Sequence, residues 1–285
     1  MPREQTLSFA QDAAARFRQN KTAMAAFGIL IWLILMAIFG PLFSHFSYSE
    51  IHLESVNQPP SSLYWFGSDD LGRDIFCRVF WGARISLFIG IAAAVIDMAI
   101  GVLWGSVAAY WGGKVEEAMM RFCDVLYSIP HLLVAVFLTV IRGNGIGTIL
   151  LAMTITGWMN MSRIVRGQII QIKQSDFIDA ARAIGASRTR ILFRHLIPNV
   201  MGPIVATMTL TIPTAIFTEA FLSFVGLGIQ LPAASWGIMI NEGLTAMNYY
   251  PWRLLFPSVM ITLTMLSFNI LGNALRDVLD PRLRR

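Results

Sequence analysis

The segment DAARAIGASRTRILFRHLIPN, residues 179–199, is a charged stretch in an otherwise very apolar chain. Hydrophobic residues account for 55% of the 285 residues and charged residues for only 14%, and the mean hydropathy is +0.60. A soluble domain usually carries about 25% charged residues. We therefore expect a membrane protein in which this segment joins two apolar spans.

Apolar runs long enough to cross a bilayer lie on both sides of the segment. A bilayer core of about 30 Å requires roughly 20 apolar residues in a helix. A transmembrane β-barrel would show alternating apolar and polar residues, whereas these runs are continuous. The sequence therefore predicts an all-α membrane protein with six transmembrane helices, at residues 24–43, 86–110, 119–141, 146–162, 200–225 and 254–275.

The distribution of basic residues predicts that both chain ends face the cytoplasm. Lys and Arg are enriched in the cytoplasmic loops of membrane proteins. With the N-terminus inside, 17 of the 22 Lys and Arg residues fall in inner segments, and only Arg73, Arg78, Arg84, Arg142 and Arg253 fall outside. The net charge of +5 is then explained by the basic residues that set the membrane orientation, and it requires no nucleic-acid partner.

The spans divide the chain into a cytoplasmic N-terminal segment, residues 1–23, and a transmembrane domain, residues 24–285. The domain contains an outer loop at 44–85 and a cytoplasmic loop at 163–199. Ser8 and Gln11 have capping-box spacing, so the N-terminal segment is either a short amphipathic helix on the inner membrane surface or a solvated tail. The first apolar run lacks a small-residue cleavage site and is expected to remain as an anchor.

The cytoplasmic loop is predicted to form two short helices joined by a sharp turn. Asp176 can cap the first helix, Gly185 suits the left-handed position at its end, and Ser187 can cap the second. Small alanines permit close approach of another protein, while lipid headgroups are an alternative partner for the arginines. The residues predicted to form the contact are Phe177, Asp179, Ala180, Ala181, Ile184, Gly185, Arg188, Arg190, His195 and Pro198.

The outer loop ends in GSDDLGRDIFCRVFWGARISL, residues 67–87, which predicts an amphipathic helix at the outer interface. Asp69 or Asp70 can cap this helix, and Asp74 and Arg78 have the spacing of an i,i+4 ion pair. The alternative is a surface helix that only anchors the loop. The polar and glycine positions of this stretch are Asp70, Gly72, Arg73, Asp74, Arg78, Gly82 and Arg84.

Polar residues within two of the spans are candidates for a solute path. Thr207, Thr211, Thr214 and Thr218 recur at helical spacing, and Glu219 follows them. They either form a polar wall or donate to backbone carbonyls four residues earlier around the bend at Pro213. Asp97 lies inside the second span, where a carboxylate marks either a functional site or a neutral or hydrogen-bonded residue at a helix contact.

Four stretches resemble one family of transport proteins. The pattern D-A-A-x3-G-x9-H-L-I-P-N, starting at Asp179, resembles the EAA loop of ABC importer permeases, in which Glu is usual at this first position. The outer-loop stretch resembles the signature of the peptide/nickel branch, with Cys77 where Ser is common. TEAFLSFVGLGIQLPAASWGIMI (218–240) and NILGNALRDVLDPRLR (269–284) resemble the C-type membrane subunit of that branch. The resemblance extends over residues 20–285.

This resemblance implies a type I importer fold in the bacterial inner membrane, with a cytoplasmic coupling helix in the EAA-like loop. Such a subunit forms half of a path for oligopeptides or dipeptides, or alternatively for nickel complexes or another small solute. It pairs with a second similar permease, receives solute from an extracytoplasmic binding protein, and docks on two cytoplasmic ATPase subunits. The EAA-like helix fits a groove on one of these ATPases.

The sequence predicts no catalytic, cofactor or metal site on this chain. Gly113-Lys114 lacks the phosphate-loop pattern, because Ala108 stands at the first Gly position and Val115 at the Ser/Thr position. ATP and Mg²⁺ would therefore belong to partner subunits. A rival function, an ion- or proton-coupled carrier using Asp97 and Glu219, is disfavoured because the six spans show no obvious inverted repeat.

Overall fold

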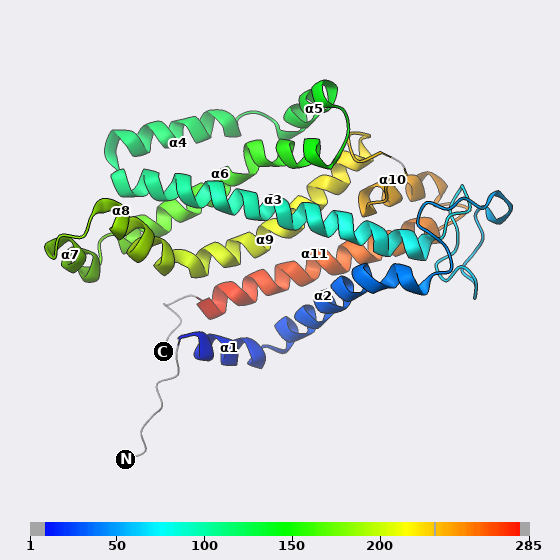
Figure 1. The fold of residues 1–285 in the computed structure, drawn as a ribbon, viewed down its shortest axis with the longest axis horizontal. Helices are drawn as coiled ribbons and strands as arrows, with labels where there is room; N and C mark the ends of the chain where they lie inside the picture. The colour runs from blue at the N-terminus through cyan, green and yellow to red at the C-terminus, as the bar shows by residue number, and fades with distance from the viewer. Residues whose placement is uncertain (1–8, 231, 280–285) are drawn as a thin grey trace, which may run out of the picture.

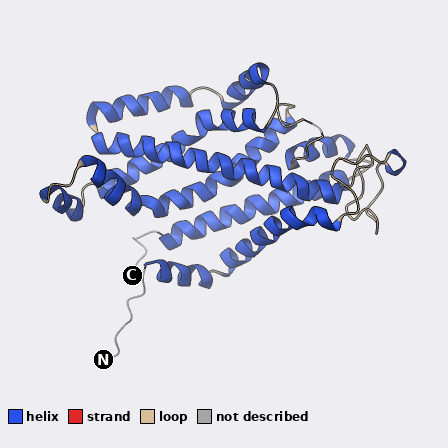
Figure 2. Ribbon diagram, viewed as in Figure 1, coloured by secondary structure: helices blue, strands red, loops and turns tan. Residues whose placement is uncertain are grey.

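The computed structural model describes residues 9–230 and 232–279, and this part of the chain is built almost wholly of helices and loops (Figure 2). The predicted all-α class is confirmed. The helices are α1 Phe9–Gln19, α2 Lys21–Phe39, α3 Ile75–Trp111, α4 Gly113–Tyr127, α5 His131–Arg142, α6 Ile146–Ile172, α7 Asp176–Ala183, α8 Arg188–Arg190, α9 Ile197–Phe224, α10 Trp236–Ala246 and α11 Trp252–Leu279.

The long helices lie side by side along the molecule (Figure 1). Helix α3 packs against α6 and α9, and α11 packs against α9 and α2. Helices α7 and α8 project at one end, which we call the coupling end. Residues 44–74 and α10 lie at the opposite end, which we call the loop end. These correspond to the predicted cytoplasmic and outer ends of the bundle.

Four helical segments of the described residues are long and apolar enough to cross a membrane, namely Lys21–Phe43, Ile75–Trp111, Arg188–Phe224 and Trp252–Leu279. A fifth span results if the bent pair α4 and α5 is taken together. The predicted fourth span lies in α6, which is less apolar because polar residues such as Asn160 interrupt it. The total of six spans and their orientation stay predictions.

The third predicted span, residues 119–141, is wrong as a continuous helix. Helices α4 and α5 meet at an angle of 73°. The break falls at Ser128–Pro130, where Pro130 has no backbone N–H to continue the helical ladder. The bend carries α5 away from the line of α4 and over the side of α6 (Figure 1).

The predicted amphipathic helix and the second span are one helix, α3, which runs for 37 residues. Asp74 caps it, accepting hydrogen bonds from the backbone N–H groups of Phe76 at 3.1 Å and Cys77 at 3.2 Å. The predicted caps Asp69 and Asp70 and the predicted Asp74–Arg78 pair are therefore wrong. Because the Asp74 carboxylate faces the helix end and Ser44, Arg78 pairs elsewhere.

A buried ionic cluster holds the loop end together. The Arg78 side chain is about 1% exposed and lies 3.4 Å from Asp69 and 3.3 Å from Glu242 of α10. Arg73 pairs with Asp69 at 2.6 Å, and Arg253 of α11 pairs with Asp70 at 3.2 Å. The start of α3 is thus a buried junction between the loop, α10 and α11, not an interfacial or surface helix.

The remaining residues of this stretch also contact neighbouring elements. Arg84 donates to the carbonyls of Ala37 at 2.6 Å and Ile38 at 2.8 Å, which are free acceptors near the end of α2. Gly82 lies against the backbone of Ser235, and Gly72 lies against the carbonyl of His52. The outer-loop stretch therefore has an architectural role in the structure.

Residues 9–19 form the helix α1, which packs against α2 and α11. The predicted capping box begins at Ser8, which lies outside the described residues. Its proposed place on the inner membrane surface stays a prediction.

We predict that Arg78→Met destabilises the protein by about 3 kcal/mol, because it removes a buried charge that pairs with both Asp69 and Glu242 and leaves Arg73 as the one remaining partner that these carboxylates share. Thermal unfolding of the purified protein in detergent measures this loss. Arg142→Met, at an exposed position, is the control. Equal unfolding temperatures for the two variants would show that the cluster does not stabilise the fold.

Candidate functional site

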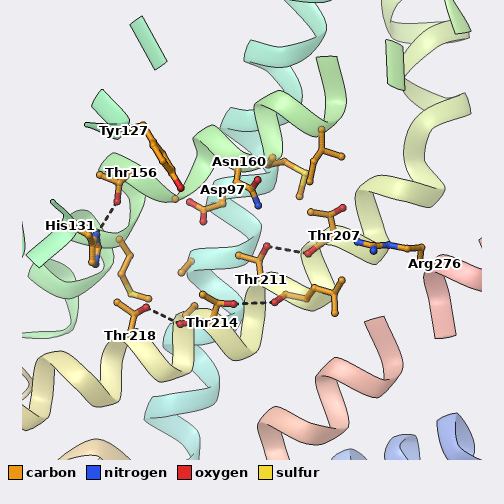
Figure 3. A pocket seen from close by; sticks show the side chains of 17 residues that line it. Asp97, Tyr127, His131, Thr156, Asn160, Thr207, Thr211, Thr214, Thr218 and Arg276 are labelled. Carbon is orange, nitrogen blue, oxygen red and sulfur yellow. Dashed lines mark hydrogen bonds between the residues drawn. The ribbon is translucent and has the colours of Figure 1, made fainter. Parts of the chain in front are cut away.

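A cavity of about 350 Å³ lies between α3, α6 and α9, and the bend of α4 and α5 closes one side (Figure 3). Most of its surface is apolar, but polar side chains reach it from six helices. These polar residues are Asp97 of α3, Tyr127 of α4, His131 of α5, Thr156 and Asn160 of α6, Thr207, Thr211, Thr214 and Thr218 of α9, and Arg276 of α11.

The four threonines of α9 follow one face of the helix along the cavity wall (Figure 3). Each hydroxyl also donates to the carbonyl four residues earlier, at distances from 2.8 Å for Thr207 and Thr218 to 3.4 Å for Thr214. Both sequence interpretations therefore describe the same residues. Since the hydroxyl protons are used within the helix, the oxygens can still accept hydrogen bonds from a molecule in the cavity.

Glu219 does not line this cavity, although the sequence grouped it with the threonines. Its side chain is fully buried and accepts hydrogen bonds from three hydroxyls, Ser86 at 3.1 Å, Ser223 at 2.9 Å and Ser235 at 2.8 Å. Successive residues of a helix point about 100° apart, so Glu219 faces α3 while Thr218 faces the cavity. Its contacts join α9 to α3 and to the segment before α10.

Asp97 reaches the cavity from the middle of α3 and is only 5% exposed. Its carboxylate lies directly against Gly157 of α6. Its Oδ1 atom has no hydrogen-bond partner among the described residues. The structure is consistent with both sequence interpretations, since the carboxylate reaches the cavity and also lies at a contact between α3 and α6.

His131 is a cavity residue that the sequence analysis did not select. Its Nδ1 lies 2.9 Å from the hydroxyl of Thr156, and its Nε2 is buried with no partner in the described part of the chain. Tyr127 stands on the other side of the same bend. Only the bend at Pro130 brings these residues to the cavity, so counting apolar runs could not identify them. Asn160 did leave a signal, since it interrupts the fourth apolar run.

At the coupling end, α7 packs on the bundle through one face and exposes the other. Ile178 and Ala181 are buried with Ile191 and Leu192, in a cluster that reaches α6. Phe177 is 44% exposed and Ile184 is 86% exposed. Ala181 is predicted to take part in the contact with another protein, but it packs inward, because positions 178 and 181 lie one turn apart on the buried side.

The turn between α7 and α8 has the predicted form. Gly185 has a φ of +81°, the left-handed conformation that glycine adopts without strain. Ser187 caps α8 by accepting a hydrogen bond from the backbone N–H of Arg190 at 3.3 Å. The predicted first cap, Asp176, is instead the first residue of α7, and Ser175 precedes it.

Helix α8 is continuous with the cavity-lining helix. A π-helical turn, Ile191–Leu196, joins α8 to α9, and Pro198, the second residue of α9, lacks the N–H that would continue the hydrogen-bond ladder there. Among the other residues predicted for the contact, Asp179, Ala180, Arg188 and Arg190 are exposed and His195 is half-buried. Asp179 also pairs with Arg182 at 2.8 Å.

The coupling end is also tied to α3. The Lys173 ammonium donates to the carbonyls of Ala109 at 3.1 Å and Tyr110 at 2.7 Å, which lie at the end of α3. Burial lowers the pKa of Lys173, the nearby Arg182 lowers it further, and Glu116 opposes the shift. The loop before α7 is therefore fastened to the helix that carries Asp97.

Two family models match the chain. The model described as the binding-protein-dependent transport system inner membrane component matches residues 101–285, which include the cavity wall on α9 and the whole coupling end. The chain belongs to this permease family. The second model, the N-terminal TM domain of oligopeptide transport permease C, matches residues 8–60. The predicted membership of the ABC importer permeases, in the C-type branch, is confirmed.

Two curated permeases from Bacillus subtilis are similar to this one over nearly its whole length. The oligopeptide transport system permease protein is 54% identical over 282 residues, covering 99% of this chain and 92% of the relative. The dipeptide transport system permease protein is 53% identical over 281 residues, covering 98% and 88%. The chain is thus a transport component of the inner membrane and not an enzyme.

A solved structure of an inward-facing MetNI methionine ABC transporter supports the importer fold. Its matching chain aligns with a TM-score of 0.57 at 20% identity, covering 73% of this permease and 97% of that chain. This similarity concerns the fold alone. The role of membrane subunit of an ABC importer rests on the family match and on the curated relatives.

Proposed function

We propose that this permease forms half of a membrane path for oligopeptides or dipeptides. The observation that carries the proposal is identity above 50%, over at least 98% of the chain, to permeases named for these two substrates. The cavity on α9 has suitable chemistry, since hydroxyl oxygens can accept from peptide N–H groups and the apolar wall can hold side chains. Its volume of about 350 Å³ is within the range of small-molecule sites.

The proposed partners are a second similar permease, two ATPase subunits and an extracytoplasmic binding protein. Helix α5 presents a strongly apolar outer surface, with Phe137 64% exposed, Val140 79% and Ile141 63%. A surface of this kind suits either lipid or the second permease. At the coupling end, exposed Ile184 and Phe177 are the apolar side chains best placed to enter a groove on an ATPase.

In this proposal the ATPase moves α7, and α7 moves α9. The buried contacts of Ile178 and Ala181 transmit a displacement of α7 to the π-helical turn Ile191–Leu196, and the continuous helix carries it to the threonine wall. Lys173 carries part of the same displacement to α3. The two walls of the cavity would therefore move together when the ATPases close.

Reconstitution of the whole transporter in liposomes tests the substrate. We expect uptake of a radiolabelled tripeptide that requires ATP inside the vesicle and binding protein outside. Uptake of a nickel complex with no uptake of peptides would favour the alternative substrate. Peptide uptake by this chain alone, without nucleotide, would contradict the proposal.

We predict that Thr211→Leu combined with Thr214→Val lowers peptide uptake about tenfold, because two hydrogen-bond acceptors worth about 0.5–1.5 kcal/mol each leave the wall. Assembly with the partners should be unchanged, as measured by co-purification. Thr209→Val is the matched control: its hydroxyl also donates to a carbonyl four residues earlier, but it is not part of the cavity lining. Equal uptake by the double variant and the control would argue against the path.

We further predict that Ile184→Glu abolishes co-purification of the ATPases while the permease still inserts and folds, because this side chain is 86% exposed. Ala181→Glu is a less selective test, since it places a charge among buried apolar residues. Gly185→Arg would in addition strain a left-handed backbone. Ile51→Glu, at an exposed isoleucine of the loop end, is the matched control. Normal ATPase recovery with Ile184→Glu would contradict docking through this residue.

A further inference from the structure

The mechanism described so far leaves Asp97 without a role. A carboxylate at the middle of a membrane-spanning helix is costly, and such residues usually face a partner or a functional cavity. Only 5% of the Asp97 surface is exposed, and Asp97 forms no ion pair with any of the described residues. It is also the only acidic side chain among the residues that line the cavity.

The local backbone makes room for this carboxylate. A Cβ atom on residue 157 would overlap Oδ2 of Asp97, so glycine at this position lets the side chain lie across α6 at the cavity edge. Figure 3 shows the Asp97 carboxylate between Tyr127 and His131 on one side and Asn160 on the other. Two independent observations therefore concern the Asp97 carboxylate: its Oδ1 has no hydrogen-bond donor among the described residues, and Gly157 leaves the space that the carboxylate occupies.

The surrounding groups leave the carboxylate available to a cation. Arg276 also lines the cavity, but it lies in the last turn of α11 and is exposed. The Nδ1 atom of His131 forms a hydrogen bond with the hydroxyl of Thr156 and not with Asp97. A compact group with several N–H donors and a positive charge would complement Asp97, and a primary ammonium has this chemistry.

We propose that Asp97 binds the ammonium group of a peptide in the cavity, while the threonine oxygens of α9 accept from its backbone. This inference rests on the proposed peptide path and assigns a specific contact within it. Two sources supply the same chemistry, the N-terminal amino group and a lysine side chain. The permease would then select for positive charge independently of the binding protein.

A labelling experiment on the assembled transporter, without binding protein or nucleotide, tests the contact directly. Thr214→Cys places a thiol at an exposed position of the cavity wall, whereas Cys77 and Cys123 are both buried. We measure how trialanine, N-acetyl-trialanine and an N-acetylated lysine peptide slow maleimide labelling. The concentration that halves the rate reports the affinity of each peptide.

Trialanine is expected to protect the thiol, and Asp97→Asn should raise its half-protecting concentration about tenfold or more, as expected for a lost charge-assisted hydrogen bond. N-acetyl-trialanine should protect weakly and equally in both proteins. Protection by the N-acetylated lysine peptide that depends on Asp97 would extend the site to lysine side chains, and its absence would restrict the site to the N-terminus. Equal protection by trialanine with and without Asp97 would overturn the proposal, as would an equal loss for trialanine and its acetylated form.

Two glycines of α6 provide a second pair of variants. Gly157→Ala should displace the carboxylate and reproduce the effect of Asp97→Asn, whereas Gly167→Ala should have no effect because no atom lies within 4 Å of its added Cβ. If wild-type vesicles import trialanine but Asp97→Asn leaves protection unchanged, this inference alone fails. If wild-type vesicles import no peptide, the proposed function fails and the inference fails with it.

Discussion

The structure depends on one continuous run of helix that joins the coupling end to the cavity. In a bilayer core every backbone N–H and C=O group must be satisfied within the protein, so a span cannot flex freely through broken hydrogen bonds. From α8 through the π-helical turn and along α9 the chain stays helical, although Pro198, Pro203 and Pro213 lack the N–H that would continue the hydrogen-bond ladder. Because Ile178 and Ala181 of α7 are buried against this helix, a push on α7 is transmitted to the threonine wall.

The loop end supplies the opposing anchor. The cluster around Arg78 joins residues far apart in the sequence, and the three serines around Glu219 join α9 to α3 and to the segment before α10. Both are buried, so both resist displacement. The cavity lies between a movable end and a fixed end. This arrangement suits an importer whose energy source acts from one side of the membrane and whose path must change shape between the helices.

The sequence predicted well where a local rule determined the structure. The left-handed glycine at 185, the cap at Ser187 and the threonine face of α9 all follow from short-range spacing. The sequence-based predictions were wrong where residues distant in the sequence determine the ion-pair partner or the buried face. Arg78 pairs with Glu242 rather than with its helical neighbour Asp74, and Ala181 packs inward because α7 lies against the π-helical turn Ile191–Leu196. His131 reaches the cavity only through a bend whose angle depends on packing, which no spacing rule determines.

The central claim is that the coupling end and the cavity wall move as one body. Spin labels on cysteines placed at Ala183, an exposed α7 residue outside the predicted contact, and at Thr214 allow the distance between them to be measured in the assembled transporter by pulsed electron paramagnetic resonance with and without bound ATP. Rigid transmission predicts the same distance distribution in both states while the transporter changes conformation. A shift of about 5 Å, one helical turn, would show a hinge between these elements and would contradict the account.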